Sequence, residues 1–350
     1  MSEQIGRLRG VAVARSTDDG QGGTRAARRR GGPLGKILIA LVVLGAIAAG
    51  ALYWLGRSGT VAEGCSVKTP AGEGTLELPQ AANAATIAAV AHSRGLPDRA
   101  VTIALATAMQ ESKIHNLSGG DRDSVGLFQQ RPSQGWGTVE QIGDPVYATN
   151  KFLDGLVKVP GYTRLPLTDA AQQVQKSGYP QAYAKHETKA TLLASALTGR
   201  EAASVNCVVH EFAEPEAPAP SESDAAATAS ATPVAADRTQ ALTDRVRREF
   251  GRTVTAAAGY SSTIKGAQNA VSLTPEPSAS TESGPDAALQ NGWAVAHWAV
   301  THAQQLGIET VAYDGKIWRM TKSADGWKPQ ASGTSTSLVL VSVAAPGAKS

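Results

Sequence analysis

The residues that could do chemistry gather in one stretch, which runs from Ala104 to Gly137 and reads ALATAMQESKIHNLSGGDRDSVGLFQQRPSQGWG. In this stretch a run of apolar residues is followed by Glu111, which lies at the C-terminal end of an expected helix. The helix dipole opposes negative charge at that end, and apolar neighbours add a desolvation penalty, so both favour the protonated acid. Lys113 would act in the opposite direction if it pointed inward. A carboxyl group that keeps its proton near neutral pH can protonate a glycosidic oxygen as a general acid. The alternative is an ordinary solvated residue at a helix end.

Polar and aromatic side chains follow this carboxyl group. The segment GLFQQRPSQGW supplies the amides of Gln129 and Gln130, the guanidinium of Arg131 and the indole of Trp136. Amides suit sugar hydroxyls and N-acetyl groups, and an indole can stack on the C–H face of a sugar. These residues are therefore candidates for binding a glycan, although the alternative places Leu127 and Phe128 in the core and the glutamines on the surface.

This pattern resembles the lysozyme-like lytic transglycosylase family and also the goose-type lysozymes. The resemblance covers about residues 80–200 and depends on Glu111-Ser112 closing an apolar helix, with GLFQ beginning fifteen residues after the glutamate. It implies a peptidoglycan-cleaving enzyme in which Glu111 is the acid and base, Ser112 supports it and Gln129 lines the glycan groove. The segment SGYPQAYAKHE is similar in position to the family's Ala-Tyr-Asn segment, without the asparagine, so Tyr179 or Tyr183 would replace the family tyrosine.

The mechanism implied by the resemblance depends on a second carboxyl group. An inverting hydrolase needs a base about 6.5–9.5 Å from the acid to activate water. A lytic transglycosylase needs none, because the C6 hydroxyl of the muramic acid attacks C1 and leaves a 1,6-anhydro end. We expect the transglycosylase route, whereas Asp121 and Asp123 keep the hydrolytic route open unless they only form a turn beside glycine. A peptidoglycan-binding scaffold without activity is the further alternative.

Helices must position these residues. Ala-rich and apolar patterns predict helices over 81–94, 98–111, 145–157 and 168–176, and another from about 181 towards 197, with no strand before Cys207. The sequence therefore predicts a mostly α lysozyme-like catalytic domain over residues 76–210. A Pro/Ala/Ser/Thr linker without fixed structure is expected over 211–239. A small α+β domain of unassigned role is expected over 240–350.

The N-terminal part predicts attachment to a membrane. Residues 1–36 are basic and Gly-rich, as in a disordered cytoplasmic tail, and 37–55 contain no charged residue. Nineteen apolar residues at about 1.5 Å each can cross a ~30 Å hydrocarbon core. The positive-inside rule places the N-terminus in the cytoplasm and the later residues outside, tethered by 56–75. A cleaved signal peptide is the alternative to this single-pass anchor.

The remaining composition limits cofactors and partners. Cys65 and Cys207 bracket the lysozyme-like region, and a disulfide between them would be worth about 5 kcal/mol in the chain-entropy model, with two buried thiols as the alternative. The net charge of +3 is too small to indicate nucleic acid. His297 and His302 lie about 140° apart on one helix and are poor ligands of one metal, so we expect neither metal nor cofactor. Peptidoglycan is the expected partner, and an envelope protein could bind the C-terminal domain, where tryptophans are expected to pack in the core.

Overall fold

The computed structural model describes residues 33–57, 61–179, 181–213, 238–265, 267, 269–276 and 285–345. The chain divides into two compact units, Met1–Thr60 and Val61–Ser350. Most of the expected disordered tail (1–36) and most of the expected linker (211–239) lie outside the described residues, so both stay predictions.

The first unit contains one helix, α1, which spans Pro33–Arg57. Its described side chains are Ile37 and those of residues 39–50, and all of them are exposed. Over the described residues no helix reaches the length and apolarity that crossing a membrane requires. This finding overturns the prediction of a single transmembrane helix over residues 37–55.

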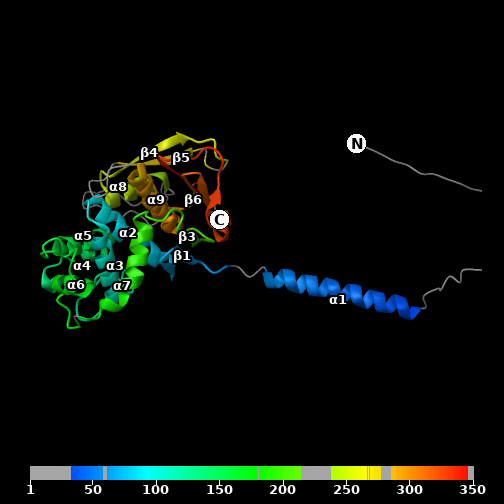
Figure 1. The fold of residues 1–350 in the computed structure, drawn as a ribbon, viewed down its shortest axis with the longest axis horizontal. Coiled ribbons are helices and arrows are strands. Elements are labelled where there is room, and N and C mark those ends of the chain that lie inside the picture. Colours follow the sequence, from blue (N-terminus) through cyan, green and yellow to red (C-terminus); the bar gives the residue numbers. More distant parts are fainter. Residues whose placement is uncertain are drawn as a thin grey trace, which may run out of the picture. The chain divides into compact units, whose positions relative to one another are not determined.

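The first half of the second unit is a helical bundle built around α3 (Figure 1). Helix α3 spans Asp98–Ser112 and is buried almost all round, as its apolar sequence predicts. The Ala-rich helix α2 packs beside it and begins with a capping box between Glu77 and Gln80. The surrounding helices are α2 (Leu78–Ser93), η1 (Pro132–Gln134), α4 (Val139–Gly143), α5 (Pro145–Leu156), α6 (Leu167–Gln175), η2 (Ala184–His186) and α7 (Glu187–Leu197).

A small antiparallel sheet joins the two ends of this bundle. Its strands are β1 (Gly64–Thr69), β2 (Gly72–Leu76) and β3 (Val205–Val208), in the order β2-β1-β3. The expectation of no strand before Cys207, and of a mere tether over 56–75, is therefore wrong. In β1 the alternate residues Cys65 and Val67 are buried. A stretch this short shows too few alternations to be identified from sequence.

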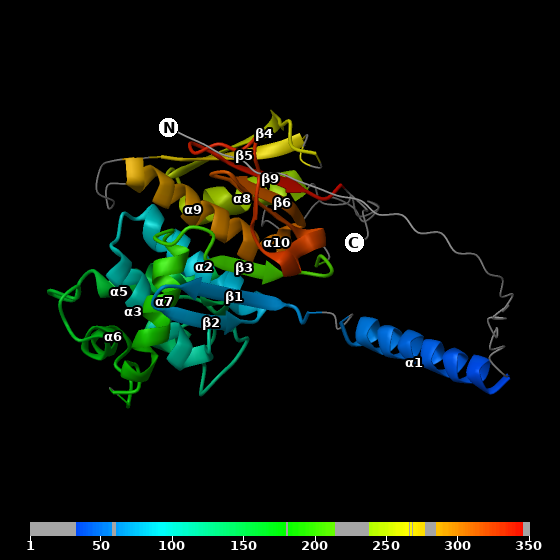
Figure 2. The ribbon, with the colours of Figure 1, turned by 45° about the vertical axis from the view of Figure 1, so that its right-hand side comes forward.

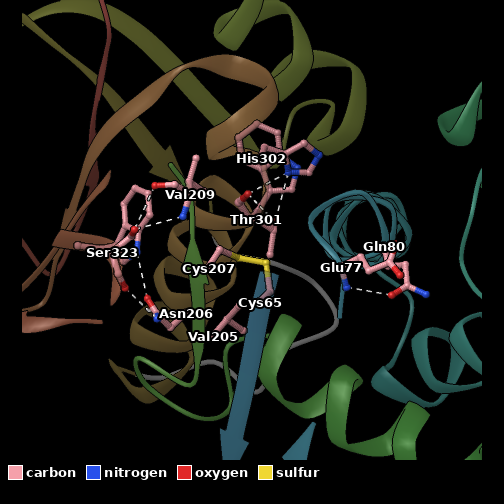
Figure 3. Close-up of a disulfide and its surroundings, with 12 residues drawn as sticks. Cys65, Glu77, Gln80, Val205, Asn206, Cys207, Val209, Thr301, His302 and Ser323 are labelled. Atoms are coloured by element: carbon pink, nitrogen blue, oxygen red, sulfur yellow. Dashed lines mark hydrogen bonds between the residues drawn. A yellow bond between two sulfur atoms is a disulfide. The ribbon is translucent and has the colours of Figure 1, made fainter. Parts of the chain in front are cut away.

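The disulfide between Cys65 and Cys207 is present, as predicted. The two residues lie directly opposite each other in the pairing of β1 with β3, and both are buried (Figure 3). The bond joins positions 142 residues apart in the sequence. It therefore ties the first strand of the unit to the strand that follows the helical bundle.

The second half of the unit is built on a six-stranded antiparallel sheet with the order β4-β5-β9-β6-β7-β8. Helix α9, drawn in orange in Figure 2, packs against this sheet on one side and against α2, α7 and β3 on the other. The elements are α8 (Arg238–Phe250), β4 (Val254–Ser261), β5 (Asn269–Pro275), α9 (Pro285–Thr301), α10 (Ala303–Leu306), β6 (Ile308–Tyr313), β7 (Lys316–Arg319), η3 (Met320–Asp325), β8 (Lys328–Pro329) and β9 (Val339–Val343).

A hydrophobic core runs through both halves, and this corrects the predicted fold class further. Residues 61–350 form a single α+β unit, in place of a mostly α domain followed by a separate small α+β domain. The tryptophans of the second half lie in this core: Trp293, Trp298 and Trp318 are buried, and the partly buried Trp327 packs against Trp293. Such aromatic packing leaves these side chains unavailable as an exposed binding surface.

Candidate active site

Glu111 lies in the last turn of α3, where the sequence predicts it. The helix is buried from Ala100 to Met109, so the backbone that carries Glu111 is held in the core. Lys113 ends the helix with a left-handed backbone (φ 56°), and its side chain is exposed, so it does not point inward. Glu111 itself is half-buried. A rigid helix thus presents one carboxyl group at the boundary between core and surface.

Tyr183 is the residue that binds Glu111. Its hydroxyl donates a 2.7 Å hydrogen bond to Glu111 Oε1, although the two residues are 72 positions apart. The Tyr183 side chain is completely buried, and burial, with the hydrogen bond to Glu111 as the next cause, raises the pKa of this phenol well above its usual range. The phenol therefore keeps its proton and acts as a fixed donor. Tyr179, the other candidate, is 78% exposed.

Ser112 connects the end of α3 to the GLFQ segment. Its buried hydroxyl lies 2.7 Å from the carbonyl oxygen of Leu127 and 3.1 Å from that of Ala108. A hydroxyl has one proton to donate, so it is shared between these two acceptors or given to the nearer one. The loop that follows α3 is thereby anchored directly behind Glu111.

The GLFQ segment is a tight turn whose middle residues belong to the core. Gly126 has a positive φ of 78°, and a Cβ there would lie 2.5 Å from the carbonyl oxygen of Ile142, so glycine is required. Leu127 and Phe128 are completely buried, and Phe128 stacks on Phe152 with ring centroids 4.7 Å apart. For these two side chains the core alternative is the right one.

The two glutamines after Phe128 use their amides within the protein. Gln129 Nε2 donates to the Gly126 carbonyl oxygen (3.2 Å), and its Oε1 accepts from the Ser124 hydroxyl (3.0 Å). Gln130 is buried and donates to the Ala148 carbonyl oxygen at 3.2 Å. Through these contacts both residues hold the backbone beside Glu111, while the buried Gln130 Oε1 has no hydrogen-bond partner among the described residues.

Asp123 and Arg131 form an ion pair in the same loop. Arg131 Nε lies 2.6 Å from Asp123 Oδ1, and the backbone N–H of Ser133 donates to Oδ2 at 2.8 Å. The hydrogen bonds from Ser133, followed by that from Arg131, hold the pKa of Asp123 well below its usual range. Asp121 in contrast has an exposed side chain. Trp136 is half-buried against the core, and its carbonyl oxygen accepts from the Tyr147 hydroxyl.

Sequence reasoning missed a second contact beside Glu111, between Gln110 and His186. His186 Nε2 lies 3.2 Å from Gln110 Oε1, and burial, followed by the charges of Lys185 and Lys189, lowers the pKa of the imidazole. Tyr183 and His186 lie three residues apart in one short segment. The consecutive residues Gln110 and Glu111 of α3 therefore both bind this segment. No motif in the sequence marks this pair, since its members are 76 residues apart.

In the part of the chain that the structure describes, no group of three or more His, Cys, Asp or Glu side chains is arranged to hold a metal ion.

Comparison with known families concerns the second half of the chain. A family model described as "VldE, C-terminal domain" matches residues 231–338. This range holds α8 to β8, and it covers less than half of the 350 residues, so it assigns no family to the whole chain. It also lies outside residues 80–200, where the resemblance to lytic transglycosylases stays a prediction. No curated protein matches the chain.

Proposed function

We propose that this protein cleaves the glycosidic bond between N-acetylmuramic acid and N-acetylglucosamine in peptidoglycan, with Glu111 as the acid and base. The hydrogen bond from Tyr183 to Glu111 Oε1 carries the proposal. An ordinary solvated glutamate at a helix end would not require a buried tyrosine as its hydrogen-bond donor. The donor from Tyr183 is what a carboxyl group with a chemical role would require. The Ser112 bond to Leu127 adds support, because it fixes the orientation of that helix end.

In the proposed reaction each oxygen of Glu111 has one role. Tyr183 donates to Oε1, which leaves Oε2 to carry the acidic proton. In the proposed reaction Oε2 protonates the glycosidic oxygen, and the bond from C1 of the muramic acid to that oxygen breaks. The resulting Glu111 carboxylate then accepts the proton of the C6 hydroxyl of the muramic acid. At the same time the oxygen of that hydroxyl bonds to C1, which gives a 1,6-anhydro end. The Tyr183 hydrogen bond is stronger to a carboxylate than to the neutral acid, so it favours the charge that forms during proton transfer.

The two aspartates bear differently on the hydrolytic alternative. Asp123 has both oxygens bound, to Arg131 and to the Ser133 backbone, so it is poorly suited to take a proton from water. Asp121 is the candidate base that the hydrolytic route would have to use. We therefore favour the transglycosylase route, which requires no second carboxyl group.

We further propose that the second unit works outside the cytoplasm. The disulfide between Cys65 and Cys207 supports this location, because disulfides persist in oxidising compartments and are rare in the cytosol. Peptidoglycan is found on the same side. Binding of an envelope protein by the C-terminal half stays a prediction.

The test is digestion of purified peptidoglycan by the unit Val61–Ser350, with products identified by mass spectrometry. The wild type is compared with Glu111→Gln and with Glu73→Gln, which removes an exposed carboxylate on β2. We expect 1,6-anhydro products from wild type and Glu73→Gln, and none from Glu111→Gln. Reducing ends would indicate the hydrolase and direct attention to Asp121. Undiminished activity of Glu111→Gln would refute the proposed role, and peptidoglycan binding without cleavage would favour the scaffold.

A further inference from the structure

A carboxyl group is buried where the two halves of the second unit meet, away from the proposed site. Glu249 lies at the end of α8 and has no exposed surface. The Thr86 hydroxyl of α2 donates to its Oε1 at 3.0 Å, and Trp298 Nε1 of α9 donates to its Oε2 at 2.7 Å. We name Thr86, Glu249, Trp298 and His302 the Glu249 cluster. It joins residues 163 and 216 positions apart in the chain.

The imidazole of His302 faces this carboxyl group with an acceptor nitrogen. His302 follows α9 and is buried (Figure 3 labels it beside Thr301). Its Nδ1 lies 2.9 Å from the Trp298 carbonyl oxygen, so Nδ1 carries the proton and donates there. Its Nε2 is then an acceptor that lies 3.4 Å from the Thr86 hydroxyl and 3.7 Å from Glu249 Oε1. Two buried acceptors that face each other favour a proton on one of them, and the carboxyl group is placed to hold it.

The other charged and titratable groups around Glu249 come from α2 and α8. Arg245 on α8 places Nε 3.5 Å from Glu249 Oε1 but is itself partly exposed. Arg248 pairs with Asp144 and acts on Glu249 only through its charge. From α2, His92 packs edge-on against Phe250, and burial lowers its pKa. The positive charges of Arg245 and Arg248 favour the ionised form of Glu249, so they oppose the effect of burial on its pKa.

Burial outweighs these cations. It raises the pKa of Glu249 to about 7, against the opposing effects of Arg245 and of the hydrogen bonds from Trp298 and Thr86. Burial also lowers the pKa of His302 to about 3, so the imidazole is packed in its neutral form. The direction of both shifts agrees with the geometry, in which the proton belongs to the carboxyl group.

We propose that Glu249 takes up a proton when residues 238–345 pack against α2, so that the contact between the two halves is proton-linked near neutral pH. In the unfolded chain the carboxyl ionises with a pKa of 4.5, and in the folded protein at about 7. Its contribution to stability is therefore complete below the lower value and is lost as the pH rises through the higher one.

The buried histidines act in the opposite direction. His297 and His302 have folded pKa values of about 4 and about 3, below the 6.5 of the unfolded chain. Their contribution is complete above 6.5 and is lost as the pH falls. The pH profile of the wild type therefore mixes both effects, and only comparison with a Glu249 variant isolates the carboxyl group.

The test is urea unfolding of the full chain from pH 5 to pH 8, for wild type and Glu249→Gln. The matched control is Asp244→Asn, which removes a more exposed carboxylate of α8 that pairs with Arg247. From the two pKa values, the ratio of folding constants, variant over wild type, should rise on the order of 10- to 100-fold across this range. The ratio for Asp244→Asn should stay constant. A constant ratio for Glu249→Gln would overturn the proposal.

A second measurement applies if Glu249→Gln does not fold. The side-chain carboxyl carbon of Glu249 can be titrated by NMR in the folded wild-type protein. We expect a midpoint near 7, well above the 4.5 of an unperturbed glutamate. A midpoint at that ordinary value would refute the proposal without the use of any variant.

Discussion

The replacement Tyr183→Phe tests the proposed chemistry most directly. It deletes one oxygen and keeps the ring, which is completely buried and should hold its place in the core. The change removes the 2.7 Å hydrogen bond that the Tyr183 hydroxyl donates to Glu111 Oε1. A hydrogen bond to a charged group contributes about 1.5–3 kcal/mol, against less for a neutral partner.

The expected loss follows from that energy. A hydrogen bond to a neutral partner contributes about 0.5–1.5 kcal/mol, so the difference that acts on the transition state is about 1–1.5 kcal/mol. Because about 1.4 kcal/mol is tenfold in rate, kcat should fall by roughly 5- to 13-fold. KM should change little, because the Tyr183 side chain is buried and its hydroxyl is bound to Glu111 Oε1. The assay is the initial rate of muropeptide release, with the thermal midpoint measured in parallel to establish that the variant is folded.

Two comparisons make this prediction refutable. Tyr179→Phe alters an exposed tyrosine in the same segment and should retain the wild-type rate within about twofold. The double variant Glu111→Gln/Tyr183→Phe should be no slower than Glu111→Gln alone, because residues that act as a unit are not additive. A folded Tyr183→Phe enzyme with the wild-type kcat would show that the phenol does not assist Glu111.

Three further predictions concern stability, each measured by urea unfolding. Replacing Cys65 and Cys207 together by alanine should lower the unfolding free energy by about 2–5 kcal/mol, because the bond closes a loop of 142 residues; an unchanged value would contradict this. Gly126→Ala should cost at least 1–3 kcal/mol from its positive φ and from the contact with Ile142, whereas Gly119→Ala, with open space around it, should not. Asp123→Asn should destabilise the protein at pH 7 but progressively less below about pH 3.8: the folded pKa is lowered, so this stability is present above the unfolded value and lost as the pH falls. Curves that stay equally far apart at low pH would refute that account.

The chemistry at the end of α3 could be predicted from sequence because it is local. Glu111, Ser112 and the GLFQ turn lie within twenty residues, and the apolar run before them indicates a buried helix. The sequence could not choose between Tyr179 and Tyr183, because that choice depends on which ring enters the core. It also could not show that Gln129 and Gln130 donate to the backbone carbonyl oxygens of Gly126 and Ala148, since an amide suits a backbone partner as well as a sugar.

The errors in the fold have a different origin. The Pro-rich stretch after residue 211 suggested that the parts on either side are independent domains, but a linker says nothing about whether the parts pack together. That packing depends on α2, whose buried alanines allow α8 and α9 to approach closely. Alanine is only weakly hydrophobic, so an Ala-rich helix gives a weak periodic pattern. For this reason the sequence did not identify the face of α2 that contacts α8 and α9, or the partners of Thr86. Strand β1 was missed because it is too short to show an alternating pattern, and β3 because its partner β1 lies more than a hundred residues earlier in the sequence.

The pairing of β1 with β3 has a consequence for how the polypeptide is made. A ribosome completes residues 64–69 long before it reaches 205–208, so β1 and β2 can form only a two-stranded hairpin, which is marginal in water, during most of synthesis. The buried face of α2 must wait longer still, until α8 and α9 have emerged. The nascent chain therefore has to be kept from aggregating until nearly its whole length is available, and a chain terminated early would leave an Ala-rich face without cover.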